Sequence, residues 1–131
     1  IKLAKNYEIN AYFGTADNIP FKENEFDLLI FGWCLYLCDI KDLFKIGQEA
    51  NRVTKPKSWI CIVDFWSPEL TKIPYKHKDG IFTNKFDFSK IFKWHPFYTV
   101  YDHQIRDQSN CQYTDEKNNW LSITTLRKME V

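Results

Sequence analysis

The sequence has almost no net charge and no apolar run long enough to cross a membrane, and each absence excludes a class of protein. Eighteen basic residues stand against 17 acidic ones, a net charge of +1, whereas nucleic-acid-binding proteins usually carry a strong positive excess. The longest apolar run, Leu28 to Cys38, is shorter than a membrane span and lacks the position and flanks of a signal peptide. We therefore expect no nucleic-acid partner, no membrane partner and a cytoplasmic location.

Paired cysteines at short spacing are also missing. The four cysteines stand at positions 34, 38, 61 and 111 without a CxxC motif, although zinc sites usually take their ligands in such pairs. We predict no metal site and four reduced, mostly buried thiols, as is usual in the cytoplasm.

Aromatic side chains, in contrast, are abundant. The chain has 11 Phe, 7 Tyr and 5 Trp, together 18% of its residues. Such rings fill a core quickly, and they also line ligand pockets. A hydrophobic content of 44% in 131 residues predicts a globular chain with one domain, residues 1–131, large enough to fold without disulfides.

Two nearly continuous apolar runs, at 26–31 and 58–65, predict strands covered on both faces, as in the centre of a parallel sheet. Between them apolar residues recur at helical spacing from Leu43 to Val53, and Asp39 is the expected N-cap. A strand, a helix and a second strand in this order form a βαβ unit, whose two strands are parallel.

Weaker patterns predict the rest of the chain. We expect helical turns at 1–6, a short strand at 8–13, loops at 14–21, 66–80 and 107–118, a turn at 55–57, a short helix near 87–92, and strands at 97–105 and 120–126. The last two strands follow one another without a helix between them, so they are predicted to be antiparallel neighbours.

Four segments carry a resemblance to a known family. GTADNIPF at 14–21, FDLLIFGWCLYLCD at 26–39, EANRVTKP at 49–56 and WICIVDF at 59–65 resemble, in order and spacing, the class I S-adenosylmethionine-dependent methyltransferases. The resemblance covers about residues 1 to 66. It implies an α/β fold, a Rossmann-like methyltransferase sheet with parallel central strands and an antiparallel carboxyl-terminal strand pair. It also implies methyl transfer from S-adenosylmethionine to a small-molecule acceptor.

The family's Gly-rich cofactor loop has no counterpart in this sequence. The four glycines stand at 14, 32, 47 and 80, and none belongs to a GxGxG motif. Lys57 and Ser58 replace the Gly-Gly that usually follows the family's Lys-Pro. By this resemblance the chain is the carboxyl-terminal part of a methyltransferase domain that is truncated at its amino end. The part expected to be missing contains the family's first two strands and the Gly-rich loop. We therefore expect it to bind S-adenosylmethionine weakly or not at all.

The resemblance also implies a set of cofactor-binding residues. Asp17 resembles the residue whose carboxylate accepts a hydrogen bond from the adenine amino group, and Ala16 and Ile19 resemble its neighbours in the adenine pocket. By itself Asp17 is equally compatible with an Asx-turn. A second group follows the strand at 26–31, because ligands of open α/β sheets bind outside the carboxyl ends of the strands. These residues are Phe31, Gly32 and Trp33.

Acceptor-binding residues are expected nearby at Tyr36, Asp64 and Trp66. Asp64 is also compatible with a solvated carboxylate at a strand end. The histidines at 77, 95 and 103 show no triad or ligand spacing, so the sequence leaves the catalytic groups unknown. Methyl transfer by in-line displacement depends on positioning more than on acid–base groups.

Two other interpretations remain open at this stage. The chain is also compatible with a non-catalytic module that dimerises or binds a small ligand through its aromatic residues, or with an α+β cone-like ligand-binding fold. Parallel pairing of 27–31 with 59–64 would exclude the cone-like fold. Without the family's first two strands, the edge of 27–31 is unpaired, which predicts a homo-oligomer unless residues 9–13 fill the gap.

Overall fold

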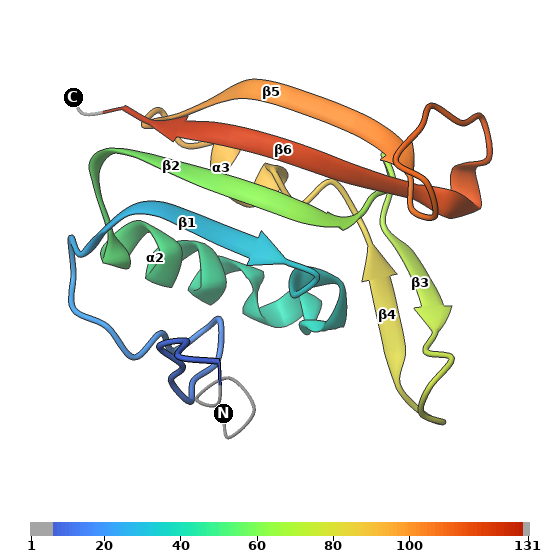
Figure 1. Ribbon diagram of the computed structural model, residues 1–131, viewed down its shortest axis with the longest axis horizontal. Helices are drawn as coiled ribbons and strands as arrows, with labels where there is room; N and C mark the ends of the chain where they lie inside the picture. Colours follow the sequence, from blue (N-terminus) through green and yellow to red (C-terminus); the bar gives the residue numbers. More distant parts are fainter. Residues whose placement is uncertain (1–6, 130–131) are drawn as a thin grey trace.

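A four-stranded sheet and a separate two-stranded hairpin form the framework of the molecule (Figure 1). The computed structural model describes residues 7–129, so the helical turns expected at 1–6 lie outside the described residues. The strands are β1 (Phe26–Gly32), β2 (Thr54–Phe65), β3 (Thr71–Pro74), β4 (Phe82–Lys85), β5 (Tyr98–Asp107) and β6 (Trp120–Lys128). The helices are α2 (Leu43–Val53), α3 (Lys90–Lys93) and the 3-10 turns η1 (Leu35–Leu37), η2 (Ile40–Asp42) and η3 (Lys117–Asn119).

The predicted βαβ unit is confirmed. β1 and β2 pair in parallel, from Leu28 opposite Trp59 to Gly32 opposite Val63, and η2 and α2 connect them. Asp39 caps η2, because its carboxylate accepts a hydrogen bond of 3.0 Å from the backbone N–H of Lys41. The parallel pair excludes the cone-like, all-antiparallel alternative.

The carboxyl-terminal half adds an antiparallel pair to the same sheet. The strand order is β1-β2-β6-β5, so β6 lies between β2 and β5 and runs antiparallel to both. The α/β fold class with parallel and antiparallel strands is therefore confirmed, including the position of the last strand beside β2.

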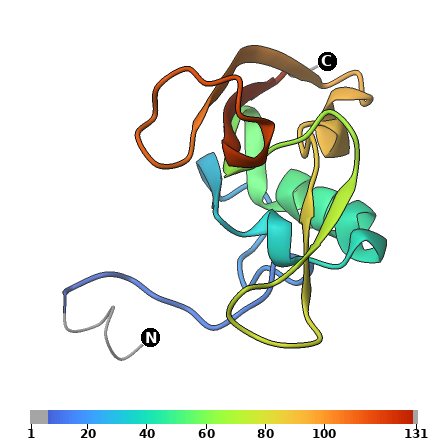
Figure 2. The same cartoon turned by 90° about the vertical axis from the view of Figure 1, so that its right-hand side faces the viewer.

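Coverage of β1 on both faces is the first expectation that the structure corrects. Leu28 and Ile30 are 50% and 58% exposed, and no other strand within residues 7–129 pairs with the outer edge of β1. The helices α2 and α3 both pack on the face of the sheet opposite to the exposed side chains of Leu28 and Ile30, as Figure 2 shows. That face holds the core, to which β1 contributes Phe31 and β2 contributes Ile60 and Ile62. An apolar run in a sequence indicates that the segment tends to be buried, but it does not indicate which other element covers the segment.

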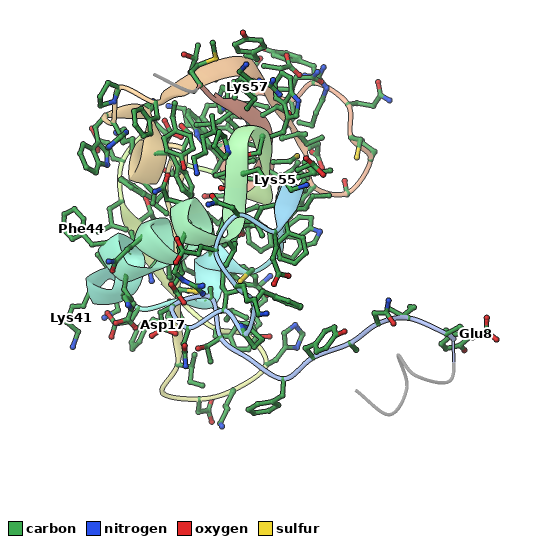
Figure 3. The ribbon with its side chains drawn as sticks, turned by 90° about the vertical axis from the view of Figure 1, so that its left-hand side faces the viewer. Glu8, Asp17, Lys41, Phe44, Lys55 and Lys57 are labelled. Atoms are coloured by element: carbon green, nitrogen blue, oxygen red, sulfur yellow. The ribbon has the colours of Figure 1, made fainter. Side chains whose placement is uncertain are left out.

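The segment 8–13 does not form the predicted strand. Glu8 has a left-handed φ of 57°, and the segment extends away from the rest of the molecule (Figure 3). Tyr12 is 63% and Phe13 88% exposed. A single strand is not stable without a partner, and this segment has none among the described residues, so it does not fill the gap beside β1.

A predicted turn and part of a predicted loop are also wrong. Residues 55–57 belong to β2, which begins directly after α2, and Lys57 with a φ of 60° interrupts the pairing with β1 as a bulge. Within the predicted loop 66–80, β3 pairs antiparallel with β4. β3 has only four residues, one of them Pro74, which explains why its pattern was not recognised.

The described residues also bear on the remaining sequence features. All four cysteines are free; three are half-buried and Cys111 is exposed. From Tyr7 to Met129, no helix is both long and apolar enough to cross a membrane.

Candidate functional site

The loop that resembles the adenine-binding motif is held in place by an ion pair at the end of α2. Glu49 Oε1 accepts a hydrogen bond of 3.0 Å from the backbone N–H of Ile19. Arg52 donates to the carbonyl oxygens of Ile19 and Phe21 at 2.9 and 2.7 Å. These contacts fix the chain on both sides of Pro20.

The sequence predicts no role for Glu49 or Arg52, because neither belongs to the apolar pattern of the helix or to the quoted adenine-binding motif. Arg52 Nε lies 2.6 Å from Glu49 Oε2, and Glu49 is only 5% exposed. The hydrogen bonds from Arg52 lower the pKa of the Glu49 carboxyl below its usual value. The available signal was the spacing of a glutamate and an arginine three residues apart on one helix.

Asp17 lies in a tight turn at the near end of this loop. The backbone N–H of Asn18 donates to the carbonyl of Thr15 at 3.0 Å, so Asp17 occupies the turn between them. Its side chain is half-buried, and no donor among residues 7–129 forms a hydrogen bond with its carboxylate. The carboxylate therefore keeps its full capacity to accept hydrogen bonds from a ligand.

The structure separates the three residues predicted at the end of β1. Phe31 is 4% exposed and packs in the core against Phe92, with ring centroids 6.3 Å apart. Gly32 lies at the surface, and a Cβ built on it meets no atom within 4 Å. Trp33 has a left-handed φ of 53° and a ring that is 44% exposed. Gly32 and Trp33 thus form an open rim, whereas Phe31 supports it from inside.

Asp64 organises the chain that follows this rim. It is fully buried, so the alternative of a solvated strand-end carboxylate is wrong. Its Oδ2 accepts hydrogen bonds from the backbone N–H groups of Leu35 and Tyr36 at 2.8 and 3.2 Å, and its Oδ1 accepts from Phe65 at 2.9 Å. Burial raises its pKa to about 6, and these backbone hydrogen bonds oppose the rise. Asp64 therefore positions η1 and does not present an open carboxylate.

Phe65, at the end of β2, joins the rim to a cavity. Its ring makes edge-on contacts with Trp33 and with Tyr36, in each case with centroids 5.0 Å apart. The ammonium group of Lys85 lies 5.4 Å from the centroid of the same ring. Behind Phe65, a cavity of about 450 Å³ lies between the β3–β4 hairpin and the segment 108–119.

The other predicted acceptor residues are dispersed. Tyr36 lines the cavity, but Trp66 does not. Trp66 packs instead against His103 and Trp120, with centroids 5.5 and 5.6 Å away. His77 lines the cavity, whereas His103 shares a hydrogen bond of 2.7 Å with the Thr124 hydroxyl.

A second hollow, of about 550 Å³, lies beside the 14–21 loop and is lined by Ile19 but not by Ala16 or Asp17. Between positions 7 and 129, no three His, Cys, Asp or Glu side chains come together as a metal site would require.

The chain is similar in sequence to known methyltransferases. Residues 2–62 match the family described as a methyltransferase domain. The chain is 30% identical over 95 residues to a demethylmenaquinone methyltransferase of Staphylococcus saprophyticus, a match that covers 67% of this chain and 40% of that protein. It is 39% identical over 51 residues to a 2-phytyl-1,4-naphtoquinone methyltransferase of Nostoc punctiforme, covering 39% of this chain and 21% of that protein.

A solved structure shares the fold. The 1,6-didemethyltoxoflavin-N1-methyltransferase of Burkholderia thailandensis, solved with 1,6-didemethyltoxoflavin and S-adenosylhomocysteine bound, superposes with a TM-score of 0.74 at 13% identity, covering 98% of this chain and 56% of that one. The family match and the shared fold together identify the class that the chain resembles, the class I S-adenosylmethionine-dependent methyltransferases. The methyltransferase domain that matches residues 2–62 confirms this relationship. The chain spans less than half the length of either curated relative.

Proposed function

We propose that the protein carrying these residues transfers a methyl group from S-adenosylmethionine to a small aromatic acceptor of the quinol type. The observation that supports this most strongly is the arrangement of the Asp17 turn, the Gly32–Trp33 rim and the aromatic cavity behind Phe65. The two curated relatives, whose names state methylation of quinones, support the choice of acceptor.

The described residues fit the adenine side of the cofactor. The Asp17 carboxylate would accept from the adenine amino group, with Ala16 and Ile19 beside the ring and the Gly32–Trp33 rim as one wall. The open space around Gly32 admits a close ligand. When bound, the cofactor would supply an electrophilic methyl group on a sulfonium, and its displacement by the acceptor atom would release S-adenosylhomocysteine and, from the acceptor, a proton to solvent. The residues of this chain would orient the acceptor for that displacement.

Partners for the ribose and the methionine end are not found in this sequence, which has no GxGxG motif. Each missing charge-assisted hydrogen bond is worth about 1.5–3 kcal/mol. We therefore propose that the 131-residue chain alone binds the cofactor weakly or not at all. Calorimetric titration with S-adenosylmethionine tests this, because a dissociation constant below about 50 micromolar would contradict weak binding.

Methyl transfer itself is tested on the natural protein that contains these residues. With radiolabelled S-adenosylmethionine and a reduced naphthoquinone, label should enter the acceptor, and Asp17→Ala should reduce kcat/KM mainly through the KM for the cofactor. An exposed residue of the same type, Asp115→Ala, is the matched control. If no label is transferred to any quinol, the proposed acceptor is wrong.

A second function is favoured by a different observation, the open edge of β1. An unpaired strand with exposed Leu28 and Ile30 is a template for pairing. A non-catalytic module that dimerises or binds a ligand would use this edge and would show no cofactor-dependent chemistry in the same assay.

A further inference from the structure

We propose that the cavity behind Phe65 binds a flat aromatic ring that carries an anionic oxygen, a carboxylate or a phenolate, with Lys85 as the ionic partner of that oxygen. The inference rests on the proposed function only in naming this ligand as the methyl acceptor. The binding site itself is argued from the cavity.

The size and the walls of the cavity suit a ring. Its volume of about 450 Å³ lies within the range of small-molecule sites. Phe65, Tyr36 and Tyr75 contribute aromatic walls, and the aliphatic parts come from Ile73 and Pro74. These residues come from the end of β2, from η1 and from the β3–β4 hairpin, so the cavity exists only when the hairpin lies against the main sheet.

The charged side chains that line the cavity are two lysines. Lys76 and Lys85 line it together with the polar ring of His77, and its lining contains no Asp or Glu among the described residues. Burial, followed by the nearby charge of Lys76, lowers the pKa of Lys85. A cationic cavity without a carboxylate lacks a built-in counter-ion, and an anionic ligand would supply one.

Lys85 also has free hydrogen-bonding capacity. Its ammonium group donates to the Asn118 carbonyl at 2.6 Å, and it lies over the Phe65 ring. An ammonium group has three N–H donors, so two remain for a ligand oxygen. The carbonyl fixes the direction of the side chain, which reduces the entropy that is lost on binding.

Two tyrosine side chains, Tyr36 and Tyr75, also line the cavity. Burial and the neighbouring Tyr75 raise the pKa of Tyr36, so the phenol of Tyr36 keeps its proton and remains a donor. Because Phe65 contacts both Trp33 and Tyr36, a ring in the cavity is separated from the Gly32–Trp33 rim by one side chain. This position places a ligand beside the carboxyl ends of β1 and β2, where an acceptor must lie.

Direct binding to the 131-residue chain tests the proposal without any cofactor. The probe is 2-naphthoate, and the matched neutral probe is 2-naphthamide, both titrated by NMR with the shifts of Tyr36, Tyr75 and Lys85 followed. We expect 2-naphthoate to bind about tenfold or more tightly than the amide, in line with one charge-assisted hydrogen bond. Lys85→Met should remove this preference, Lys85→Arg should retain most of it, and Lys72→Met on the outer side of the same hairpin should leave it unchanged.

The relative affinity for the two probes decides whether the proposal holds. Equal affinity for the two probes, or a preference that survives Lys85→Met, would overturn the proposal. The comparison of probes on the unaltered chain remains valid even if a variant fails to fold. Binding of 2-naphthoate by a protein that transfers no methyl group would support the cavity and refute the proposed function, so the two failures are distinguishable.

Discussion

Arg52 and Glu49 form an ion pair 2.6 Å long whose remaining hydrogen bonds hold the backbone of the loop at 19–21. The pair lies near the carboxyl end of α2, more than 25 positions along the chain from that loop. Because this pair belongs to α2 and bonds the backbone next to the Asp17 turn, the position of that turn depends on an intact helix.

Arg52→Ala should therefore destabilise the protein by clearly more than a surface substitution does, because it leaves the buried Glu49 carboxylate without its partner. Chemical denaturation measures the loss, and the NMR signals of Ile19 and Phe21 should shift. Lys45→Ala, on the exposed side of the same helix, is the control and should change the free energy of unfolding by less than about 0.5 kcal/mol. A similar small effect for Arg52→Ala would contradict the anchoring role.

The buried Asp64 carboxyl predicts a distinct pH dependence. Its pKa rises from the ordinary 3.8 to about 6, so the folded state holds this proton more tightly than the unfolded chain does. Stability from this group is complete below pH 3.8 and is lost as the pH rises through 6. Between pH 4 and pH 7 the free energy of unfolding should fall by about 2 kcal/mol relative to Asp64→Asn, which cannot titrate. Urea denaturation at several pH values measures the difference, and parallel profiles would refute it.

Two glycines should respond differently to the same substitution. At Gly32 a Cβ meets nothing within 4 Å, whereas at Gly47 it would lie 2.7 Å from Ile91 Cγ2. We expect Gly47→Ala to lower the free energy of unfolding by about 1 kcal/mol through overpacking. Gly32→Ala should leave stability within about 0.5 kcal/mol of the parent.

In the natural protein, Gly32→Ala should nevertheless weaken binding of S-adenosylhomocysteine, because the new methyl group would occupy the open rim. Calorimetry on that protein measures the change. Unchanged affinity would show that no ligand approaches Gly32 closely.

The exposed edge and face of β1 predict self-association. Light scattering on the 131-residue chain should show a dimer or larger species, and Ile30→Lys should shift the chain toward monomer because a charge on an edge strand opposes pairing. Phe44→Lys is the control: Phe44 is 84% exposed but lies on α2, away from that edge (Figure 3). A soluble monomer at high concentration would contradict this prediction.

The strong periodicities of the sequence were sufficient to predict the βαβ unit and the antiparallel final pair. The family motifs predicted which loops carry the candidate site residues, but not the contacts that hold those loops. Asp64 was assigned to the acceptor, although burial and three backbone donors give it a positioning role. Hydrogen bonds between distant residues leave no periodic signal, so they were not predictable from one sequence.

The position of Lys85 in the cavity was likewise not predictable from the sequence. In the sequence Lys85 is one of many scattered lysines, and its position over Phe65 depends on β3, a strand too short to be recognised. Likewise, the apolar run of β1 indicated burial correctly in Phe31 but gave no information on what covers Leu28 and Ile30.

The hydrogen bond from Leu35 to Asp64 also orders events during folding. It joins positions 29 apart in sequence, and the entropy of closing that loop is recovered only once β1 and β2 lie side by side. We therefore expect the turn that carries Tyr36 to become ordered only after the two strands have paired. The surface formed by the aromatic walls, the hairpin and the rim would then form late in folding, once the sheet is complete.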